Sequence, residues 1–272
     1  MLQLVPLLLL AFLLPMPLLA GGKVARIAKH IDAEIVTQQT ALQPGEPFRI
    51  AVRLQMDSSW HIYWKNPGDA GLATTVDWKL PEGYTISDLE WPQPRLFGDP
   101  PEVCYGYDGH VLLMATLTPP ATITTPTITI GAAITLLACQ DVCIPGKADL
   151  SVAIDVASTS METEWSQQFQ ENEQQVPTSG EALKGASAQR TAQGIRLVVP
   201  VPANLGDVWF FAAEEGVIDH SGQQPATVQN GTLVVMLPAS PFPNADVTRL
   251  RGVLAITKHQ SLDLDLPLLA AE

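Results

Sequence analysis

The sequence predicts an all-β protein with two β-sandwich domains in tandem, joined by a short linker that is capable of forming a helix. Short stretches in which apolar and polar residues alternate recur along the chain, with turns about every 8–12 residues. The 23 prolines are spread along the chain, as expected for many short strands joined by turns. Helical periodicity is weak outside residues 157–188, where Ser, Thr, Glu and Gln dominate.

Residues 1–22 have the composition of a secretory signal peptide. Val5 to Leu14 is almost entirely apolar, and two prolines and the small residues Ala20, Gly21 and Gly22 follow. No Lys or Arg precedes the apolar run, so an uncleaved N-terminal membrane anchor remains an alternative, although a spanning helix needs about 20 apolar residues. We therefore expect an exported chain in an oxidising compartment, where a cysteine pair can persist as a disulfide.

The formal net charge of −13 at pH 7 argues against nucleic-acid binding, which needs a basic surface. An acidic surface mainly favours solubility and repels anionic lipid headgroups. The sequence contains no motif that points to a small-molecule substrate or to a bound cofactor. The cysteines and the aromatic motifs around them are therefore the candidates for chemistry.

The first domain is predicted over residues 23–156. Its clearest strand runs from Phe48 to Met56, where apolar residues occupy every second position, as in a half-buried antiparallel strand. An irregular loop with four prolines is expected at residues 92–101. Further strands are expected at residues 30–36, 60–64, 74–80, 84–91, 110–117, 128–138 and 150–156.

The linker is predicted over residues 157–188, and the second, smaller domain over residues 189–272. Trp165 and Phe169 lie four residues apart in the linker, so we expect both to pack on a neighbouring domain. The second domain has no cysteine, and its His220 and His259 are predicted to be isolated on loops or strand edges. Its strands are expected at residues 194–201, 207–213, 232–237, 250–257 and 262–268.

Two of the three cysteines, Cys139 and Cys143, form a Cys-x-x-x-Cys motif between two predicted strands. In an extended strand residues four apart are separated by about 13 Å, whereas a disulfide needs Cα atoms about 4.4–6.8 Å apart, so a bonded pair requires a sharp turn. A loop this short gives only about 2 kcal/mol of stabilisation by loop entropy. Because short, exposed disulfides are also the more easily opened ones, a redox role is favoured.

Two other roles remain open for the pair. It could be a structural staple in a non-catalytic, two-domain adaptor protein. It could also bind Cu(I) or Zn together with Cys104 and either His61 or His110, although the spacing matches no closed zinc motif. Cys104, the odd cysteine, is either a buried small side chain or a thiol that forms mixed disulfides.

Three motifs follow one another along the predicted mature chain. They are Trp60-His61-Ile62-Tyr63-Trp64-Lys65-Asn66-Pro67-Gly68-Asp69-Ala70-Gly71, Tyr105-Gly106-Tyr107-Asp108-Gly109 and Cys139-Gln140-Asp141-Val142-Cys143-Ile144-Pro145. Together they resemble the periplasmic N-terminal region of the DsbD/ScsB thiol:disulfide interchange proteins. The second segment, with Trp209-Phe210-Phe211, is similar to the second immunoglobulin-like domain of the ScsB branch. The resemblance implies two immunoglobulin-like sandwiches in tandem and a periplasmic location.

The resemblance also implies roles for individual residues. Cys139 and Cys143 would be the redox pair that alternates between dithiol and disulfide. A cap loop that shields the pair from unwanted oxidation would lie near Glu102 to Tyr105, and Cys104 falls within or next to this cap. The auxiliary residues that the resemblance assigns to the cap or to the surroundings of the pair are Cys104, Glu102, Tyr105, Tyr63 and His61.

In the family, the pair receives electrons from a membrane-embedded domain and passes them to periplasmic thioredoxin-like proteins through a mixed disulfide. Such partners include disulfide isomerases and the reductants of cytochrome c maturation. This sequence contains no counterpart of the membrane domain or of the C-terminal thioredoxin-like domain. We therefore expect a separate membrane protein as electron donor, with another donor or another role for the chain as the alternative. The expected activity is that of a protein-disulfide reductase-like electron-transfer module without a cofactor.

Overall fold

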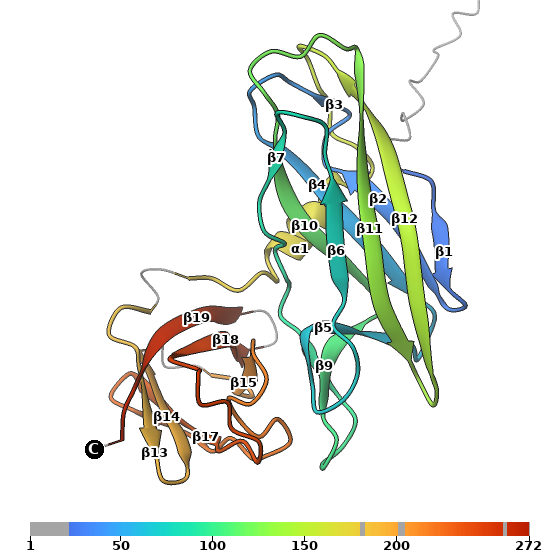
Figure 1. Ribbon diagram of the computed structural model, residues 1–272. Helices are drawn as coiled ribbons and strands as arrows, with labels where there is room; N and C mark the ends of the chain where they lie inside the picture. Colours follow the sequence, from blue (N-terminus) through green and yellow to red (C-terminus); the bar gives the residue numbers. More distant parts are fainter. Residues whose placement is uncertain (1–21, 180–182, 201–204, 258–259, 272) are drawn as a thin grey trace, which may run out of the picture.

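The computed structural model describes residues 22–179, 183–200, 205–257 and 260–271. The predicted signal peptide, apart from Gly22, and the predicted isolated residue His259 lie outside the described residues. The described residues are mostly strands, which confirms the all-β prediction (Figure 1). In this part of the chain no helix has the length and apolar composition needed to cross a membrane.

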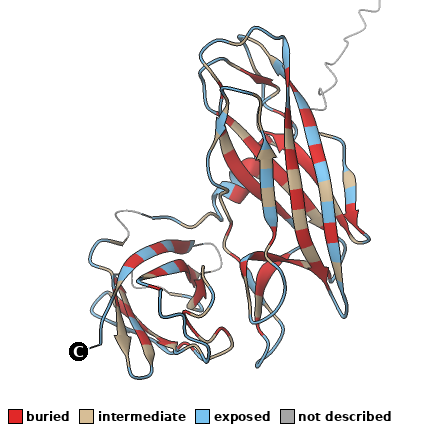
Figure 2. Cartoon of the chain, in the orientation of Figure 1, coloured by how far each residue is buried: buried red, intermediate tan, exposed pale blue. Residues whose placement is uncertain are grey.

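The first sandwich has two sheets that pack face to face (Figure 1). Many strand residues of both sheets are buried (Figure 2), and the inward-facing ones form one apolar core. This core includes Ile35, Val52 and Ile130. One sheet has five strands, in the order β1 (Ala25–Ala28), β2 (Ile31–Thr37), β4 (Phe48–Met56), β10 (His110–Thr118) and β7 (Thr85–Ile86). The other has seven, in the order β3 (Ala41–Leu42), β12 (Cys143–Val156), β11 (Thr127–Cys139), β5 (His61–Gly68), β9 (Cys104–Asp108) and β8 (Arg95–Phe97), with β6 (Thr75–Lys79) paired to β11.

The strand predicted at residues 84–91 is much shorter in the structure. Regular pairing with β10 is limited to the two residues of β7. The backbone N–H groups of Ser87 and Glu90 then bond to the carbonyls of Thr116 and Met114. Three residues of this segment therefore span two residues of β10, and such an extra residue interrupts the regular ladder.

The described part of the linker contains one α-helix, α1 (Ser166–Glu173), which covers the outer face of the five-stranded sheet. Phe169 is fully buried there, and the guanidinium of Arg53 lies 4.9 Å from the centre of the Trp165 ring. The prediction that both aromatics pack on a neighbouring domain is confirmed. The sheet residues that Phe169 contacts as a cluster are Val36, Ala51, Leu112 and Met114.

The longest strands, β11 and β12, form a hairpin that ends at the cysteine pair. Its register pairs Thr127 with Asp155 at one end and Cys139 with Cys143 at the other, so residues 140–142 form the connecting loop. Strand β12 begins at Cys143 rather than at Leu150, and Pro145 lies within it. Proline is tolerated there because β3, the neighbour of β12 in the sheet, pairs only with residues near its other end.

In the described residues, the second sandwich has seven strands, which enclose a second apolar core. Two of them were not predicted: β13, which begins inside the predicted linker, and β16, whose four residues are all exposed. The strands follow the order β15 (Trp209–Ala212), β18 (Arg249–Thr257), β19 (Gln260–Leu269), β13 (Ser187–Thr191), β14 (Gly194–Pro200), β17 (Thr232–Pro238) and β16 (Ala226–Gln229).

Candidate functional site

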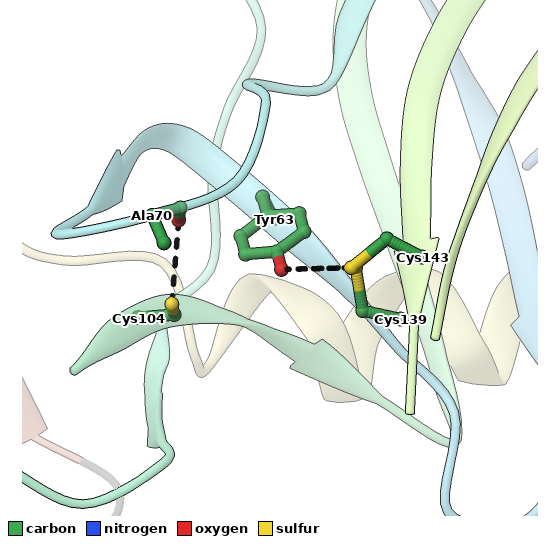
Figure 3. The surroundings of a disulfide bond; sticks show 5 residues. All are labelled: Tyr63, Ala70, Cys104, Cys139 and Cys143. Carbon is green, nitrogen blue, oxygen red and sulfur yellow. Dashed lines mark hydrogen bonds between the residues drawn. A yellow bond between two sulfur atoms is a disulfide. The ribbon is translucent and has the colours of Figure 1, made fainter. Parts of the chain in front are cut away.

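Cys139 and Cys143 are joined by a disulfide at the tip of the β11–β12 hairpin (Figure 3). Their Cα atoms are 4.1 Å apart, because the two residues face each other across the hairpin ladder. The sharp turn that the spacing required is thus supplied by residues 140–142, closed by a hydrogen bond from the N–H of Gln140 to the carbonyl of Val142. The hairpin therefore holds both sulfur atoms at one end of the first sandwich.

The two cysteines differ strongly in exposure. Cys139 is only 2% exposed, whereas Cys143 is exposed to solvent. The side chain of Val142, at the tip between them, is also 63% exposed. An incoming thiol therefore meets Cys143 and the apolar tip first, and Cys139 lies behind them.

The side chain of Tyr63, in strand β5, contacts the disulfide (Figure 3). Its hydroxyl donates a hydrogen bond of 3.0 Å to the sulfur of Cys139 and lies 3.9 Å from that of Cys143. Burial raises the pKa of Tyr63 to about 12, so the hydroxyl keeps its proton at neutral pH. Gly71 permits this position, because it has φ +110° and a Cβ there would overlap the Tyr63 ring.

His61 lies directly beside the pair, since it is the partner of Cys139 in the β5–β11 ladder. Its ring stacks on Phe97 at 4.5 Å and meets the ring of Tyr63 edge-on at 5.3 Å. Burial lowers the pKa of His61, although the carboxylate of Asp108 opposes this shift. The imidazole is therefore mainly neutral at pH 7 and acts as part of an aromatic cover.

Phe97 is a site residue that the sequence did not reveal. It lies in β8, a strand of three residues inside the predicted proline-rich loop. The only signal was a large aromatic residue next to Gly98 within that loop, and its partner could not be inferred without the fold.

Cys104 is a free thiol on the other side of Tyr63 from the disulfide (Figure 3). Its thiol donates a hydrogen bond of 3.3 Å to the carbonyl of Ala70. Burial raises the pKa of the Cys104 thiol, and the carboxylates of Asp69 and Glu102 raise it further. The Cys104 thiol is therefore mainly protonated at neutral pH.

Tyr105 points away from Cys104, because successive side chains of a strand face opposite sides. It is fully buried, and its hydroxyl lies 3.0 Å from Nδ1 of His220 in the second sandwich. No described contact joins Tyr105 to the disulfide. The prediction that His220 is isolated is wrong, because the packing of the two sandwiches buries its ring against Tyr105.

The proposed metal ligands do not form a cluster in the described part of the chain. There, no three His, Cys, Asp or Glu side chains are grouped so that they could hold a metal ion. His110 lies at the start of β10, where it pairs with Gln55, and Cys139 and Cys143 are bonded to each other.

Comparison with known proteins found a family model that matches part of this chain. Residues 31–154 match the family model described as thiol:disulfide interchange protein DsbD, N-terminal. The solved N-terminal periplasmic domain of ScsB from Proteus mirabilis is similar in fold, with a TM-score of 0.66 at 18% identity, over 92% of this chain and 98% of that chain. The periplasmic chaperone SfaE also matches, at 9% identity over 87% of this chain and 99% of that chain, but its TM-score of 0.23 supports no argument. A search of curated proteins found no match.

The matched segment contains all three sequence motifs, including the cysteine pair, and confirms the resemblance on which they were grouped. The likeness to ScsB extends over both sandwiches and confirms the predicted fold class. Residues 31–154 of this chain are therefore similar to the N-terminal domains of DsbD-type thiol:disulfide interchange proteins.

Proposed function

We propose that this chain is an exported thiol:disulfide interchange module that passes electrons between a membrane reductant and periplasmic thioredoxin-like proteins. The observation that carries the proposal is the asymmetric disulfide. Cys143 is exposed, and Cys139 is buried with the hydroxyl of Tyr63 on its sulfur. The family of residues 31–154, and the periplasmic origin of the ScsB domain with the same fold, support the setting.

The first chemical step uses this asymmetry. A thiolate of the reducing partner attacks the sulfur of Cys143, and a new disulfide forms between the partner and this chain. The Cys139–Cys143 bond breaks, and its electron pair stays on the sulfur of Cys139 as a thiolate. The hydroxyl of Tyr63, 3.0 Å away, donates a hydrogen bond to the charge that develops there.

The second step resolves the mixed disulfide. The second thiolate of the partner attacks the partner's own sulfur, so the partner leaves as a disulfide and Cys143 leaves as a thiolate. Two electrons have then moved to this chain, and protons from solvent convert the thiolates to thiols. The same steps in reverse reduce a disulfide of a thioredoxin-like protein and restore the Cys139–Cys143 bond.

The aromatic cover explains how such a pair would be selective. Tyr63, His61 and Phe97 lie over the Cys139 side of the disulfide and leave Cys143 and Val142 open. A partner that places an apolar surface on Val142 brings its thiolate to Cys143. The carboxylates near this end of the molecule do not form a metal site with the pair among the described residues.

The test is a redox titration of the full chain in glutathione buffers, with Cys104→Ser present to remove the third thiol. Alkylation and mass measurement report the dithiol fraction of Cys139 and Cys143. We expect a midpoint above about −300 mV, because structural disulfides in secreted proteins lie below that value. A midpoint below about −300 mV would instead assign the bridge a structural role.

A further inference from the structure

The back of strand β9 is held by the second sandwich. Tyr105 is fully buried there, and its hydroxyl lies 3.0 Å from Nδ1 of His220, which is only 6% exposed. The two rings meet edge-on with centroids 5.1 Å apart. A buried tyrosine hydroxyl needs such a partner, because an unpaired polar group costs free energy when it is removed from water.

Further contacts make this a packed interface rather than a single hydrogen bond. The ring of Phe211 meets that of Tyr105 edge-on at 5.0 Å. The side-chain amide of Asn66, at the end of β5, donates a buried hydrogen bond of 2.8 Å to the carbonyl of Ala212. Phe211, with Val253 and Ala255, also belongs to the apolar core of the first sandwich. The second sandwich is therefore continuous with the core beneath β5 and β9.

The opposite side of β9 faces the disulfide site. We call strands β8 and β9 and the loop between them, residues 95–108, the cap hairpin. Phe97 pairs with Cys104 in this hairpin, and each of the two residues makes a different contact near the disulfide. Phe97 stacks on His61, which is the ladder partner of Cys139, and Cys104 bonds to Ala70. A movement of the cap hairpin would therefore uncover His61 and release Cys104 together.

We propose that the second sandwich acts as a latch that keeps the cap hairpin closed beside the cysteine pair, with His220 and Tyr105 as its positioning residues. Tyr105 and Cys104 are adjacent in β9, so a force on the back of the strand is transmitted to its front. The latch gives the second sandwich a part in the exchange reaction, and in this respect it rests on the proposed function. Neither residue touches the reacting sulfur atoms.

Cys104 supplies a reporter for the latch. The chain has three cysteines, so Cys104 is the only thiol of the oxidised protein. Cys104 is only partly exposed while the cap hairpin is closed. An increase over the wild type in its rate of reaction with iodoacetamide, followed by mass measurement on the oxidised full chain, therefore reports that the cap hairpin opens more often. This reading does not require any exchange at Cys139 and Cys143.

His220→Phe keeps an aromatic ring but removes the Nδ1 atom that pairs with the Tyr105 hydroxyl. We expect Cys104 to be alkylated about fivefold faster, which corresponds to the loss of about 1 kcal/mol from one buried hydrogen bond. Arg190→Met is the matched control, because it removes a 2.7 Å hydrogen bond to the carbonyl of Val247 within the second sandwich. The control should be alkylated at the wild-type rate.

Thermal unfolding shows whether His220→Phe folds. If it does not, Tyr105→Phe, which loses only a hydroxyl, replaces it, and we expect the same faster alkylation of Cys104. In the double variant both members of the His220–Tyr105 pair are apolar, so neither leaves the other's polar atom without its partner, and the rate should return toward that of the wild type. Wild-type alkylation rates in both folded single variants would overturn the latch. The two proposals can also fail separately. A midpoint below about −300 mV in the glutathione titration, together with faster alkylation of Cys104 in the single variants, would contradict the proposed function but not the latch.

Discussion

At the scale of single residues, the two sulfur atoms of the disulfide differ in burial and in hydrogen bonding. The hairpin places Cys139 inside and Cys143 outside, and Tyr63 supplies a hydrogen bond to the inner sulfur. A thiolate leaves more readily when it is stabilised, so the inner cysteine is the better leaving group and the outer one the better target. In the proposed exchange, burial and the hydroxyl of Tyr63 therefore decide which sulfur is attacked and which one leaves.

Tyr63→Phe tests the role of this hydroxyl. Without the donor, the Cys139 thiolate loses a hydrogen bond to a charged group, worth about 1.5 kcal/mol, and reduction by dithiothreitol should slow about tenfold. Stopped-flow measurement of thiol release gives the rate. Because the raised pKa of Tyr63, about 12, keeps it protonated, the ratio of wild-type to variant rates should stay constant from pH 6 to 9.

The ratio of wild-type to variant reduction rates also separates the effect of the hydroxyl from a loss of stability. A loss of stability alone would not produce a constant slowing of reduction in folded protein. A variant that is reduced as fast as the wild type over this pH range would show that the hydroxyl of Tyr63 has no part in the reaction.

At the scale of elements, three short segments surround the hairpin tip: strand β5, the loop that contains Gly71, and the cap hairpin. Gly71 fixes the place of the Tyr63 ring because its left-handed backbone and lack of Cβ let the loop approach the ring closely. The loop, through Ala70, also receives the hydrogen bond of Cys104. One loop therefore contacts both sides of the site.

Gly71→Ala should displace the Tyr63 ring and slow reduction of the disulfide by about the same factor as Tyr63→Phe. The matched control is Gly109→Ala, which has φ +68° but open space around its Cβ position. Both variants should lose about 1 kcal/mol of stability from the backbone conformation, but only Gly71→Ala should change the reduction rate. Equal reduction rates in the two variants would contradict this account.

The elements themselves were largely predictable, because strand alternation is a local property. Phe48 to Met56 was predicted to its end residues, and it is the strand with the clearest alternation. Strand β8 and its Phe97 were missed because three residues inside a proline-rich loop carry no periodicity. Tyr63 and His61 were found through the resemblance of their motif, and their contacts with the pair follow from the ladder between β5 and β11.

At the scale of the whole molecule, the position of the second sandwich could not be predicted from local patterns. His220 looked isolated in the sequence, and Tyr105 looked like a residue of the cap. They are 115 positions apart and meet only because the two sandwiches share an apolar interface. Long-range packing of this kind decides which face of β9 is turned to the disulfide and which to the second sandwich.

The same packing places the second sandwich away from the exposed end of the disulfide. The exposed hairpin tip with Val142 and Cys143 lies at one end of the first sandwich, and the second sandwich contacts β9 on the other side of the aromatic cover. A partner that docks on the tip therefore approaches the outer sulfur without displacing the second sandwich. The two cysteines of the full chain should therefore react at very different rates.

That difference is the most direct test of the central claim, which is an exchangeable disulfide attacked at Cys143. Cys139→Ser and Cys143→Ser, each in a Cys104→Ser background, are incubated with glutathione disulfide, and the mixed disulfide is followed by mass measurement. The account predicts that Cys139→Ser, which retains the exposed Cys143, forms the mixed disulfide at least about tenfold faster than Cys143→Ser, since access controls exchange. Equal rates, faster reaction of Cys143→Ser, or no reaction in either variant would contradict it.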